Sequence, residues 1–294
     1  MPRSPDDRPA TPPGESTPPG GSGGRPAQTS SSGDREQLSP AALRRIFREA
    51  RRDPGLAVLE GLHPLKHAIR FGAEIVCVAI TERERLQALA GALAPDVLAR
   101  IERDAQAVSR DAFAALAPQP PATGVISLAR RTPGSAETLL AAEAAAPVVL
   151  LENPRDLGNL GACVRVAAAA DIAGVLSTGG HDPWDPAALR GSAGLHFALP
   201  VCHLGEDALA RLGGSPAQHD HERPLIAVDP DGEQLHPTQL PARAILAFGG
   251  ERRGLSAELL ANADARVSLP MRAGVSSLNL ATSVAALLYA WRLS

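Results

Sequence analysis

The chain has 294 residues and 44% hydrophobic residues, so it is long enough for two domains with cores of their own. Its formal net charge of −3 is not that of a protein that binds nucleic acid through its overall charge, although such a total can conceal a local basic face. The sequence contains no run of about 18 apolar residues, so we expect no membrane-spanning segment. Its three scattered cysteines argue against a disulfide or zinc framework and favour a reducing, cytoplasmic location.

Residues 1–38 are mostly Pro, Gly, Ser, Thr and charged residues. Such a segment buries too little apolar surface to offset its chain entropy, so we expect a disordered tail. The tail also lacks the apolar core and cleavage site of a secretory signal.

A small α/β domain is predicted for residues 39–130, because helical and strand patterns alternate there. Ser39-Pro40 is typical of a helix start, and Thr81-x-x-Glu84 predicts a capping box for a helix that breaks near Pro95 and resumes to Asp104. The other predicted elements of this domain are a helix to about Arg52, strands at 56–59, 74–80 and 123–129, and a helix at 63–71.

Residues 131–146 contain Pro-Gly and an alanine-rich segment, and we place an interdomain linker there. The second domain, 147–294, is predicted to contain strands at about 148–151, 173–177, 225–228, 244–248 and 266–269. Its helices are predicted at 159–170, from Asp185-Pro186, and from Ser277 to about Trp291, and a polar surface loop is expected at 205–224.

Three stretches of the second domain combine an apolar strand with a turn rich in polar residues and glycine. They are Asp156-x-x-Asn159-Leu160-Gly161-Ala162-x-x-Arg165, then Gly249-Gly250-Glu251-x-x-Gly254-Leu255, then Leu269-Pro270-Met271 with Ser277-Leu278-Asn279. Open α/β sheets bind ligands at the turns that follow their strands. The three turns are therefore candidates for one functional site.

In this order, the three stretches resemble the three motifs of SpoU/TrmH-type RNA 2′-O-ribose methyltransferases of the SPOUT class. The resemblance implies an α/β fold with a parallel sheet and a deep trefoil knot, S-adenosylmethionine as cofactor, RNA as substrate, and a homodimer in which the partner completes the site. It covers roughly the C-terminal half of the chain.

The resemblance also assigns roles to single residues. The implied catalytic set is Asn159, Arg165, Glu251, Ser277 and Asn279. The implied cofactor-binding set is Thr178, Gly249, Gly250, Glu251, Leu269, Met271 and Leu278. Two positions depart from the usual pattern, since Leu157-Gly158 replaces a frequent proline-containing turn and Gly250 replaces a frequent asparagine.

Arg165 is the residue that we most expect to take part in catalysis. A guanidinium stays protonated far above neutral pH, so it is a poor base by itself. Holding an RNA phosphate in a bidentate contact, and thereby orienting the 2′-hydroxyl, is a chemically easier role. The sequence leaves both roles open.

Other chemistries find little support. Leu255 stands where a phosphate-binding loop needs lysine, no Gly-x-Gly-x-x-Gly follows a strand, and Ser192, Ser276 and Ser277 lack the Gly-x-Ser-x-Gly setting of acyl transfer. His219-Asp220-His221 has no further ligands at metal spacing, so no metal site is predicted.

The N-terminal half resembles, more weakly, the ribosomal-protein-like RNA-binding domain of several rRNA ribose methylases, through Val58-Leu59-Glu60-Gly61, the following helix and Gly124-Val125. This domain favours rRNA over tRNA as the substrate. Two alternatives stay open: a tRNA ribose methyltransferase, and a catalytically silent RNA-binding or ribosome-assembly factor on the same scaffold.

Overall fold

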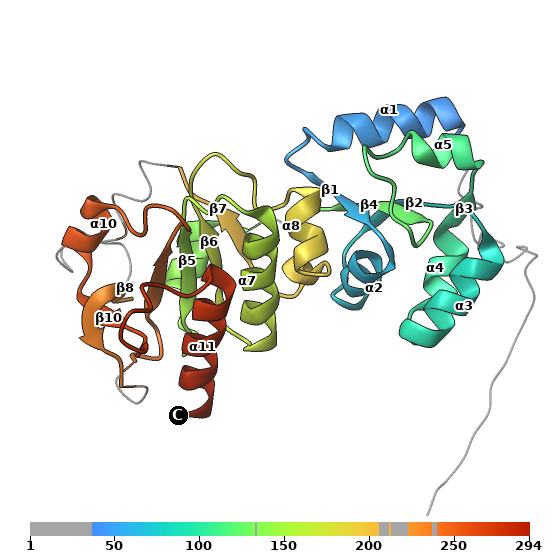
Figure 1. Cartoon of the computed structure of the whole chain (residues 1–294). Helices are drawn as coiled ribbons and strands as arrows, with labels where there is room; N and C mark the ends of the chain where they lie inside the picture. Colours follow the sequence, from blue (N-terminus) through green and yellow to red (C-terminus); the bar gives the residue numbers. More distant parts are fainter. Residues whose placement is uncertain (1–36, 133, 206–211, 213–222, 237–239) are drawn as a thin grey trace, which may run out of the picture. The chain divides into compact units, whose positions relative to one another are not determined.

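The computed structural model describes residues 37–132, 134–205, 212, 223–236 and 240–294, and residues 37–294 belong to one compact unit. Two β-sheets organise the described residues, one on each side of the predicted linker (Figure 1). The predicted tail, except for its last two residues, and most of the predicted loop 205–224 lie outside the described residues.

The N-terminal sheet has four strands in the order β1-β4-β2-β3. Strand β4 (Val125–Arg130) is antiparallel to β1 (Leu56–Glu60) and to β2 (Ile75–Ile80), and β3 (Ala105–Ala107) is parallel to β2. The three predicted strands of this region are confirmed. Strand β3 was not predicted, because three residues are too few to show an alternating pattern.

Helices cover both faces of this sheet because its strands alternate two apolar sets. On one face, Ile126 and Leu128 pack with residues of α1 (Pro40–Ala50) and α5 (Arg110–Ala114). On the other face, the core includes residues of α2 (Leu62–Arg70), α3 (Arg83–Leu93) and α4 (Leu98–Asp104). The result is a three-layer α/β/α arrangement.

The capping box predicted at Thr81 is wrong. Helix α3 begins at Arg83, its N-cap is Glu82, and no side chain caps it. Thr81 instead donates its backbone N–H to the carbonyl of Gly124 at 3.0 Å, and its hydroxyl lies where a Cβ of Gly124 would come within 2.3 Å. Packing against the neighbouring turn therefore takes the hydroxyl away from the helix.

The C-terminal sheet has six strands in the order β10-β8-β9-β5-β6-β7, and every neighbouring pair is parallel. The strands are β5 (Val148–Glu152), β6 (Gly174–Ser177), β7 (Val201–His203), β8 (Leu225–Gln234), β9 (Ile245–Gly249) and β10 (Ala265–Ser268). All five strands predicted here are confirmed, and the short β7 was missed. The trefoil knot stays a prediction, because strand order does not specify how the chain is threaded.

The strands of this sheet also carry two buried faces. Val149 and Leu151 face a core that includes α7 (Leu157–Ala169) and α11 (Leu280–Leu293), whereas Val148 and Leu150 pack with α6 (Ala136–Ala141) and α10 (Ala257–Asn262). Helix α6 lies in the predicted linker, yet its two leucines are buried in this core. Helix α10 was not predicted.

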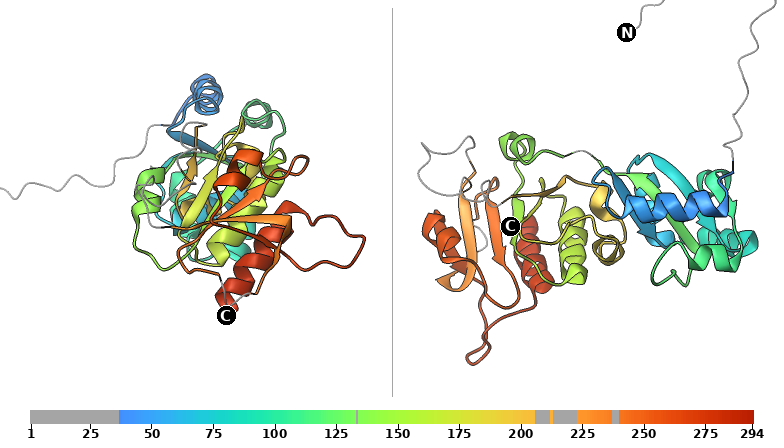
Figure 2. Two further views of the ribbon diagram at one scale, coloured as in Figure 1. Left: turned by 90° about the vertical axis from the view of Figure 1, so that its left-hand side faces the viewer. Right: turned by 90° about the horizontal axis from the view of Figure 1, so that it is seen from above.

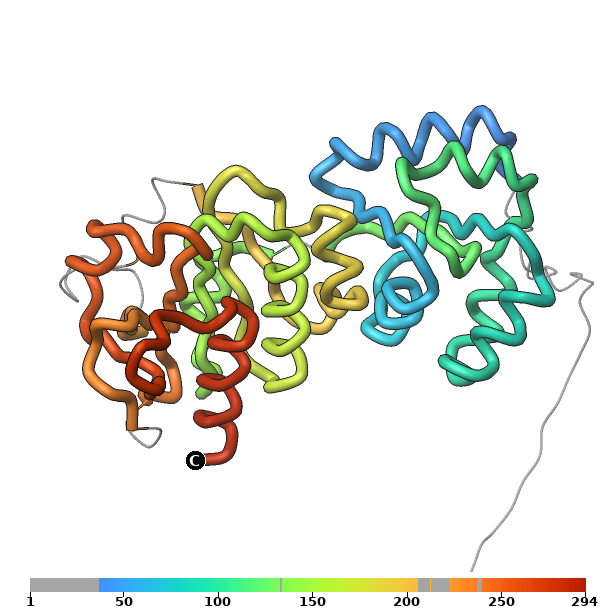
Figure 3. The backbone as a smooth tube through the Cα atoms, viewed as in Figure 1, coloured from blue at the N-terminus to red at the C-terminus, as the bar shows by residue number. Residues whose placement is uncertain are grey.

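Helix α11 lies beside α7 in all views (Figures 2 and 3). Helix α8 (Pro186–Gly191), which is followed by the 3₁₀ turn η1 (Leu195–Phe197), packs on another side of α7. Gly161 makes this close packing feasible, since a Cβ there would lie 2.2 Å from the carbonyl oxygen of Ala188. The packing fixes α7, which follows the first of the three motif turns.

Candidate active site

Three turns follow the carboxyl ends of strands of the parallel sheet. The turn after β5 leads into α7, the turn after β9 contains Gly249 to Gly254, and the segment after β10 leads into α11. Strands β5 and β9 are neighbours, so the first two turns lie at the same edge of the sheet. This edge is where parallel sheets place their ligands.

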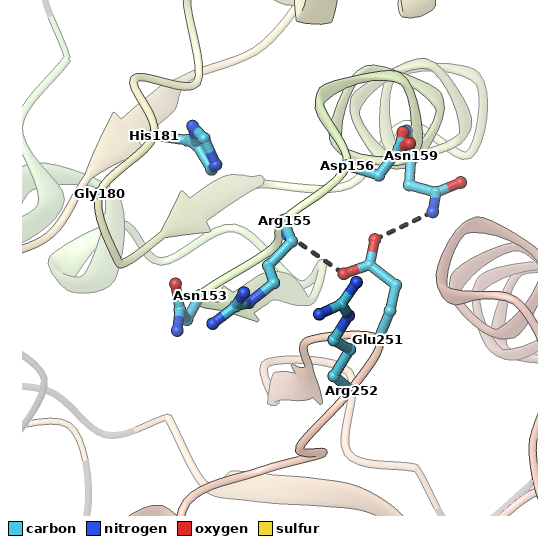
Figure 4. Close-up of a pocket in the computed structure, with 8 residues that line it drawn as sticks. All are labelled: Asn153, Arg155, Asp156, Asn159, Gly180, His181, Glu251 and Arg252. Carbon is cyan, nitrogen blue, oxygen red and sulfur yellow. Dashed lines mark hydrogen bonds between the residues drawn. The ribbon is translucent and has the colours of Figure 1, made fainter.

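Polar side chains of the three motifs form one hydrogen-bonded network. Asn159 donates from Nδ2 to Oε1 of Glu251 at 2.9 Å, and Asn279 donates from Nδ2 to Oδ1 of Asn159 at 3.0 Å. Oε2 of Glu251 also accepts from the backbone N–H of Arg155 at 3.1 Å (Figure 4). Residues separated by 92 and 120 positions in the chain therefore meet at one point.

Helix caps hold two of these segments in place. The carboxylate of Asp156 caps α7 by accepting from the N–H of Asn159 at 2.7 Å. Asn279 caps α11 through Oδ1, which accepts from the N–H groups of Ala281 and Thr282. Helix α11 thus begins at Leu280, three residues later than the predicted start at Ser277, and Asn279 has both a capping and a network role.

Two glycines allow the turns to approach one another. A Cβ on Gly249 would lie 2.0 Å from the carbonyl carbon of Gly254, and a Cβ on Gly250 would lie 2.6 Å from the carbonyl oxygen of Asn153. Glycine at position 250, where the family often has asparagine, therefore avoids this close contact with Asn153. Asn153 itself has a positive φ of 49°, a conformation that is uncommon outside glycine and occurs at functional turns.

Glu251 is held as a carboxylate. Partial burial raises its pKa, but hydrogen bonds from Asn159 and from the backbone N–H groups of Glu251, Arg155 and Asp156 outweigh this, so the pKa is lowered overall. A carboxylate that accepts several hydrogen bonds is a weak base. Glu251 is therefore suited to fixing the turns. Within the described residues, Glu251 makes no hydrogen bond or ion pair with Arg165.

A cavity of about 530 Å³ lies between the second and third motifs. We call it the apolar-walled cavity, because Leu269, Met271 and Leu278 form part of its wall beside the backbone of the glycine turn. Of the residues assigned from the sequence to cofactor binding or catalysis, those that line this cavity are Gly249, Gly250, Glu251, Leu269, Met271, Ser277, Leu278 and Asn279. Its volume and lining are typical of pockets that hold cofactors.

A second cavity, of about 700 Å³, lies between the first and second motifs. We call it the arginine cavity. Its lining residues are Asn153, Arg155, Asp156, Asn159, Gly180, His181, Glu251 and Arg252 (Figure 4). It shares Glu251 and Arg252 with the apolar-walled cavity, so the network stands at the boundary between two hollows.

Arg165 is not among the residues that line either cavity. It is exposed on α7, and none of the described residues forms a hydrogen bond or ion pair with its guanidinium. Titratable groups of α2 lie near it. The pKa of His63 is lowered by burial and then by the charges of Lys66 and Arg165. The pKa of Lys66 is lowered by burial and by the charges of Arg70 and Arg165, whereas the charge of Asp96 raises it. The structure thus separates Arg165 from the other four predicted catalytic residues.

Thr178 is also outside the apolar-walled cavity. It is buried, and its hydroxyl accepts from the backbone N–H of Asn153 at 3.0 Å. Its strand β6 lies on the far side of β5 from the glycine turn, which explains the distance from the predicted cofactor contacts. The cofactor role of Thr178 stays a prediction, and in this structure its hydroxyl supports the Asn153 turn.

Several cavity residues were missed from the sequence. Asp229 and Pro230 line the apolar-walled cavity. They directly follow the predicted strand 225–228, which was an available signal, although the observed strand β8 continues to Gln234. Arg155, Arg252 and His181 line the arginine cavity. Nothing local in the sequence distinguishes these three from surface residues.

The remaining predictions concern metals and membranes. The described residues contain no group of three or more His, Cys, Asp and Glu side chains that could hold a metal ion, and His219-Asp220-His221 lie outside the described residues. Within the described part of the chain, no helix is long and apolar enough to span a bilayer.

Comparison with known proteins identifies the domain that contains this site. Residues 146–289 match the SpoU rRNA Methylase family. The chain is 36% identical, over 143 residues, to a protein of Synechocystis named as an uncharacterized tRNA/rRNA methyltransferase, covering 48% of this chain and 51% of that protein. It is 30% identical over 150 residues to the 23S rRNA (uridine(2479)-2′-O)-methyltransferase of Streptomyces viridochromogenes, covering 48% of this chain and 50% of that enzyme. The chain thus spans about half the length of these relatives.

A solved structure is similar over more of the chain. The SpoU methyltransferase AviRb of Streptomyces viridochromogenes, in complex with the cofactor AdoMet, matches with a TM-score of 0.67 and 22% identity, covering 87% of this chain and 98% of that one. The likeness confirms the predicted α/β fold with a parallel sheet. Together with the three motifs, the match of the family model shows that residues 146–289 of this chain belong to the SpoU rRNA methylase family.

Proposed function

We propose that this protein transfers the methyl group of S-adenosylmethionine to the 2′-hydroxyl of a ribose in RNA, and that the RNA is ribosomal. The observation that carries the proposal is the network of Asn159, Glu251 and Asn279, which joins the three family motifs at the boundary of two cavities. A donor in one cavity and an acceptor in the other would approach one another across this boundary.

The apolar-walled cavity suits the cofactor. Leu269, Met271 and Leu278 offer apolar contacts to an adenine, and the turn at Gly249-Gly250 exposes backbone groups for its polar edges. When bound, S-adenosylmethionine supplies an activated methyl group on a sulfonium, so the chemistry needs no metal. Ser277 and Asn279 stand at the same cavity and complete its polar lining.

The chain's own residues align the acceptor. Glu251, a weak base whose oxygens already accept hydrogen bonds, holds the first and second turns together. Arg165, exposed and without a partner among the described residues, binds an RNA phosphate and orients the ribose hydroxyl. Alignment of this kind can account for several orders of magnitude in rate.

Support for rRNA comes from two sides. A relative that is 30% identical is named as a 23S rRNA 2′-O-methyltransferase, and the sheet of residues 56–130 has the α/β/α layers expected of a ribosomal-protein-like RNA-binding domain. A cytoplasmic location is part of the proposal, and three free cysteines are in keeping with a reducing compartment. A tRNA substrate is the alternative, because another relative is named only as a tRNA/rRNA methyltransferase.

A homodimer is part of the proposal. Arg165 lies outside both cavities of its own chain, so a second copy offers a route by which an arginine reaches the acceptor. Large apolar side chains are exposed near the third motif and on α11: Val275, Leu278, Tyr289 and Leu293. A second copy that packs against the end of α11 would cover Tyr289 and Leu293.

The decisive experiment is to incubate the purified protein with S-adenosylmethionine and ribosomal RNA, and to map ribose methylation by resistance of the modified nucleotide to alkaline cleavage. One methylated 2′-hydroxyl in rRNA, and none in tRNA, is the expected result. Methylation of tRNA alone would support the alternative substrate. If calorimetry detects no binding of S-adenosylmethionine, the catalytically silent RNA-binding factor becomes the better explanation.

A further inference from the structure

The arginine cavity contains two cationic side chains that the proposed mechanism does not yet use. Arg155 lies in the turn after β5, and Arg252 lies in the turn after β9. Figure 4 shows both side chains reaching into the space between Asn153 and Glu251, and both residues line this cavity. Two turns that are joined through Glu251 therefore each supply one guanidinium to the same hollow.

Neither guanidinium is neutralised within the described part of the chain. Both residues are exposed, and no ion pair or side-chain hydrogen bond of either one occurs among the described residues. The two carboxylates of the same cavity are engaged elsewhere. Asp156 caps α7, and both oxygens of Glu251 accept hydrogen bonds from Asn159 and from the backbone of Arg155.

This arrangement favours an anion. The carboxylates of Asp156 and Glu251 balance the two guanidinium groups in formal charge, but they accept the hydrogen bonds named above, so the N–H donors of Arg155 and Arg252 stay available. A planar guanidinium matches a phosphate through paired hydrogen bonds. A volume of about 700 Å³ is within the range of about 300–1,000 Å³ that small-ligand sites occupy. The cavity can therefore hold a nucleotide together with its phosphate.

We propose that the arginine cavity is the binding site for the acceptor nucleotide, and that Arg155 and Arg252 bind its backbone phosphate. This inference rests on the proposed function, and it adds the residues that hold the substrate. Because Glu251 and Arg252 belong to both cavities, a phosphate bound here places the attached ribose against the boundary with the cofactor site.

One other anion could use the same chemistry, namely the carboxylate of the methionine part of the cofactor. The position of Arg155 favours the RNA phosphate, because Arg155 lines the arginine cavity and is not among the residues that line the apolar-walled cavity. Arg252 lines both, so the two sources of the anion must be separated by measurement.

The test compares Arg155→Ala and Arg252→Ala with Arg253→Ala. Arg253 is a matched control, since it is an exposed arginine of the same turn that does not line the arginine cavity. For each variant, the Kd for S-adenosylmethionine is measured by calorimetry, and KM for rRNA is measured at several salt concentrations. A charge-assisted hydrogen bond contributes about 1.5–3 kcal/mol, so KM for rRNA should rise by roughly 10-fold or more in each of the first two variants.

The salt dependence provides a second readout that a merely structural role would not change. Loss of one phosphate contact should lower the slope of log KM against log salt by about 1, and Arg252→Lys should restore the slope but only part of the affinity. An unchanged KM for rRNA in Arg155→Ala would overturn the proposal. So would an effect of Arg253→Ala equal to that of Arg252→Ala.

The cofactor and the RNA give distinguishable outcomes. A weaker Kd for S-adenosylmethionine with an unchanged KM for rRNA would assign the arginines to the cofactor carboxylate and overturn the RNA assignment. If the unaltered protein methylates no RNA, the proposed function itself has failed. If the unaltered protein is active and all variants equal it, only the assignment of the arginine cavity has failed.

Discussion

Among the described residues, two hydrogen-bonded networks that contain residues of catalytic type differ in what surrounds them. Asn159, Glu251 and Asn279 form the first network, at the boundary of two cavities. Ser192 and His196 form the second: the hydroxyl lies 2.8 Å from Nδ1 of the imidazole, and Nε2 lies 2.8 Å from the carbonyl oxygen of Pro183.

The second network has the geometry of a nucleophile beside its base, but both side chains are fully buried and no substrate can reach them. Burial lowers the pKa of His196 to about 4, so the imidazole stays neutral and both of its nitrogens find partners. The first network is open to ligands on two sides. A functional site must be reachable by a ligand and must have polar groups left to bind it. Residue types and distances that suit catalysis do not by themselves distinguish such a site from a structural contact.

The largest expected effect concerns the buried network and its response to acid. The pKa of His196 is lowered from 6.5 to about 4, so the unfolded chain binds this proton more readily than the folded protein. The contribution of neutral His196 to the free energy of unfolding is therefore fully present above pH 6.5. It is lost as the pH falls through about 4, by up to about 3 kcal/mol. Urea unfolding at several pH values measures the change.

His196→Gln should flatten this acid dependence, because the glutamine does not titrate. The variant should be less stable at neutral pH, since it does not reproduce both hydrogen bonds of the imidazole. Its methyl transfer per folded molecule should equal that of the unaltered protein. If the variant is as stable as the unaltered protein but inactive, His196 takes part in catalysis and the buried network is not merely structural.

Arg165→Ala, in contrast, should reduce methyl transfer without changing the stability of the protein. Because the side chain is exposed and has no partner among the described residues, its removal should leave Tm unchanged. Methyl transfer should fall by about 100-fold, since alignment of the acceptor is lost, while S-adenosylmethionine still binds. Rate measurements at saturating RNA and calorimetry check both parts, and normal turnover would remove Arg165 from the mechanism.

Asn159→Ala tests the open network itself. The substitution leaves Oε1 of Glu251 and Nδ2 of Asn279 without their partner, so the turns lose their register and methyl transfer should fall by roughly 10-fold, with a loss of about 1 kcal/mol in the free energy of unfolding. Asn262→Ala, at the end of α10, is the control. Equal effects of the two substitutions would contradict a special role for the network.

The smallest expected effect concerns Lys66, which lies on helix α2 of the N-terminal half. Burial and the positive charges of Arg70 and Arg165 lower the pKa of Lys66, and the negative charge of Asp96 raises it. Because Asp96 is paired with Arg70, Lys66 and Arg165 are neighbouring cations that could contact RNA phosphates. Lys66→Ala should raise KM for rRNA a few-fold and lower the salt slope by about 1. Arg70→Ala is the control, because Arg70 is paired with Asp96. An unchanged salt slope would confine RNA contacts to other surfaces.

Much of the fold was predictable because local patterns carry it. Runs such as Val148–Leu151 and Ile245–Phe248 are buried on both faces of a parallel sheet, and such strands read as continuous apolar stretches. The elements that were missed, β3, β7, α5 and α10, have between three and six residues. Segments of that length are too short to display a period.

The sequence by itself determined the residue types of the site, because the motif turns sit at strand ends that apolar patterns mark. Tertiary structure alone decided which side chains meet. Asn159 reaches Glu251 across 92 residues and Asn279 across 120, whereas Arg165, six residues from Asn159, remains outside both cavities. Six residues along a helix amount to about 9 Å of rise and a different direction around its axis, so nearness in the chain does not bring two side chains into one site.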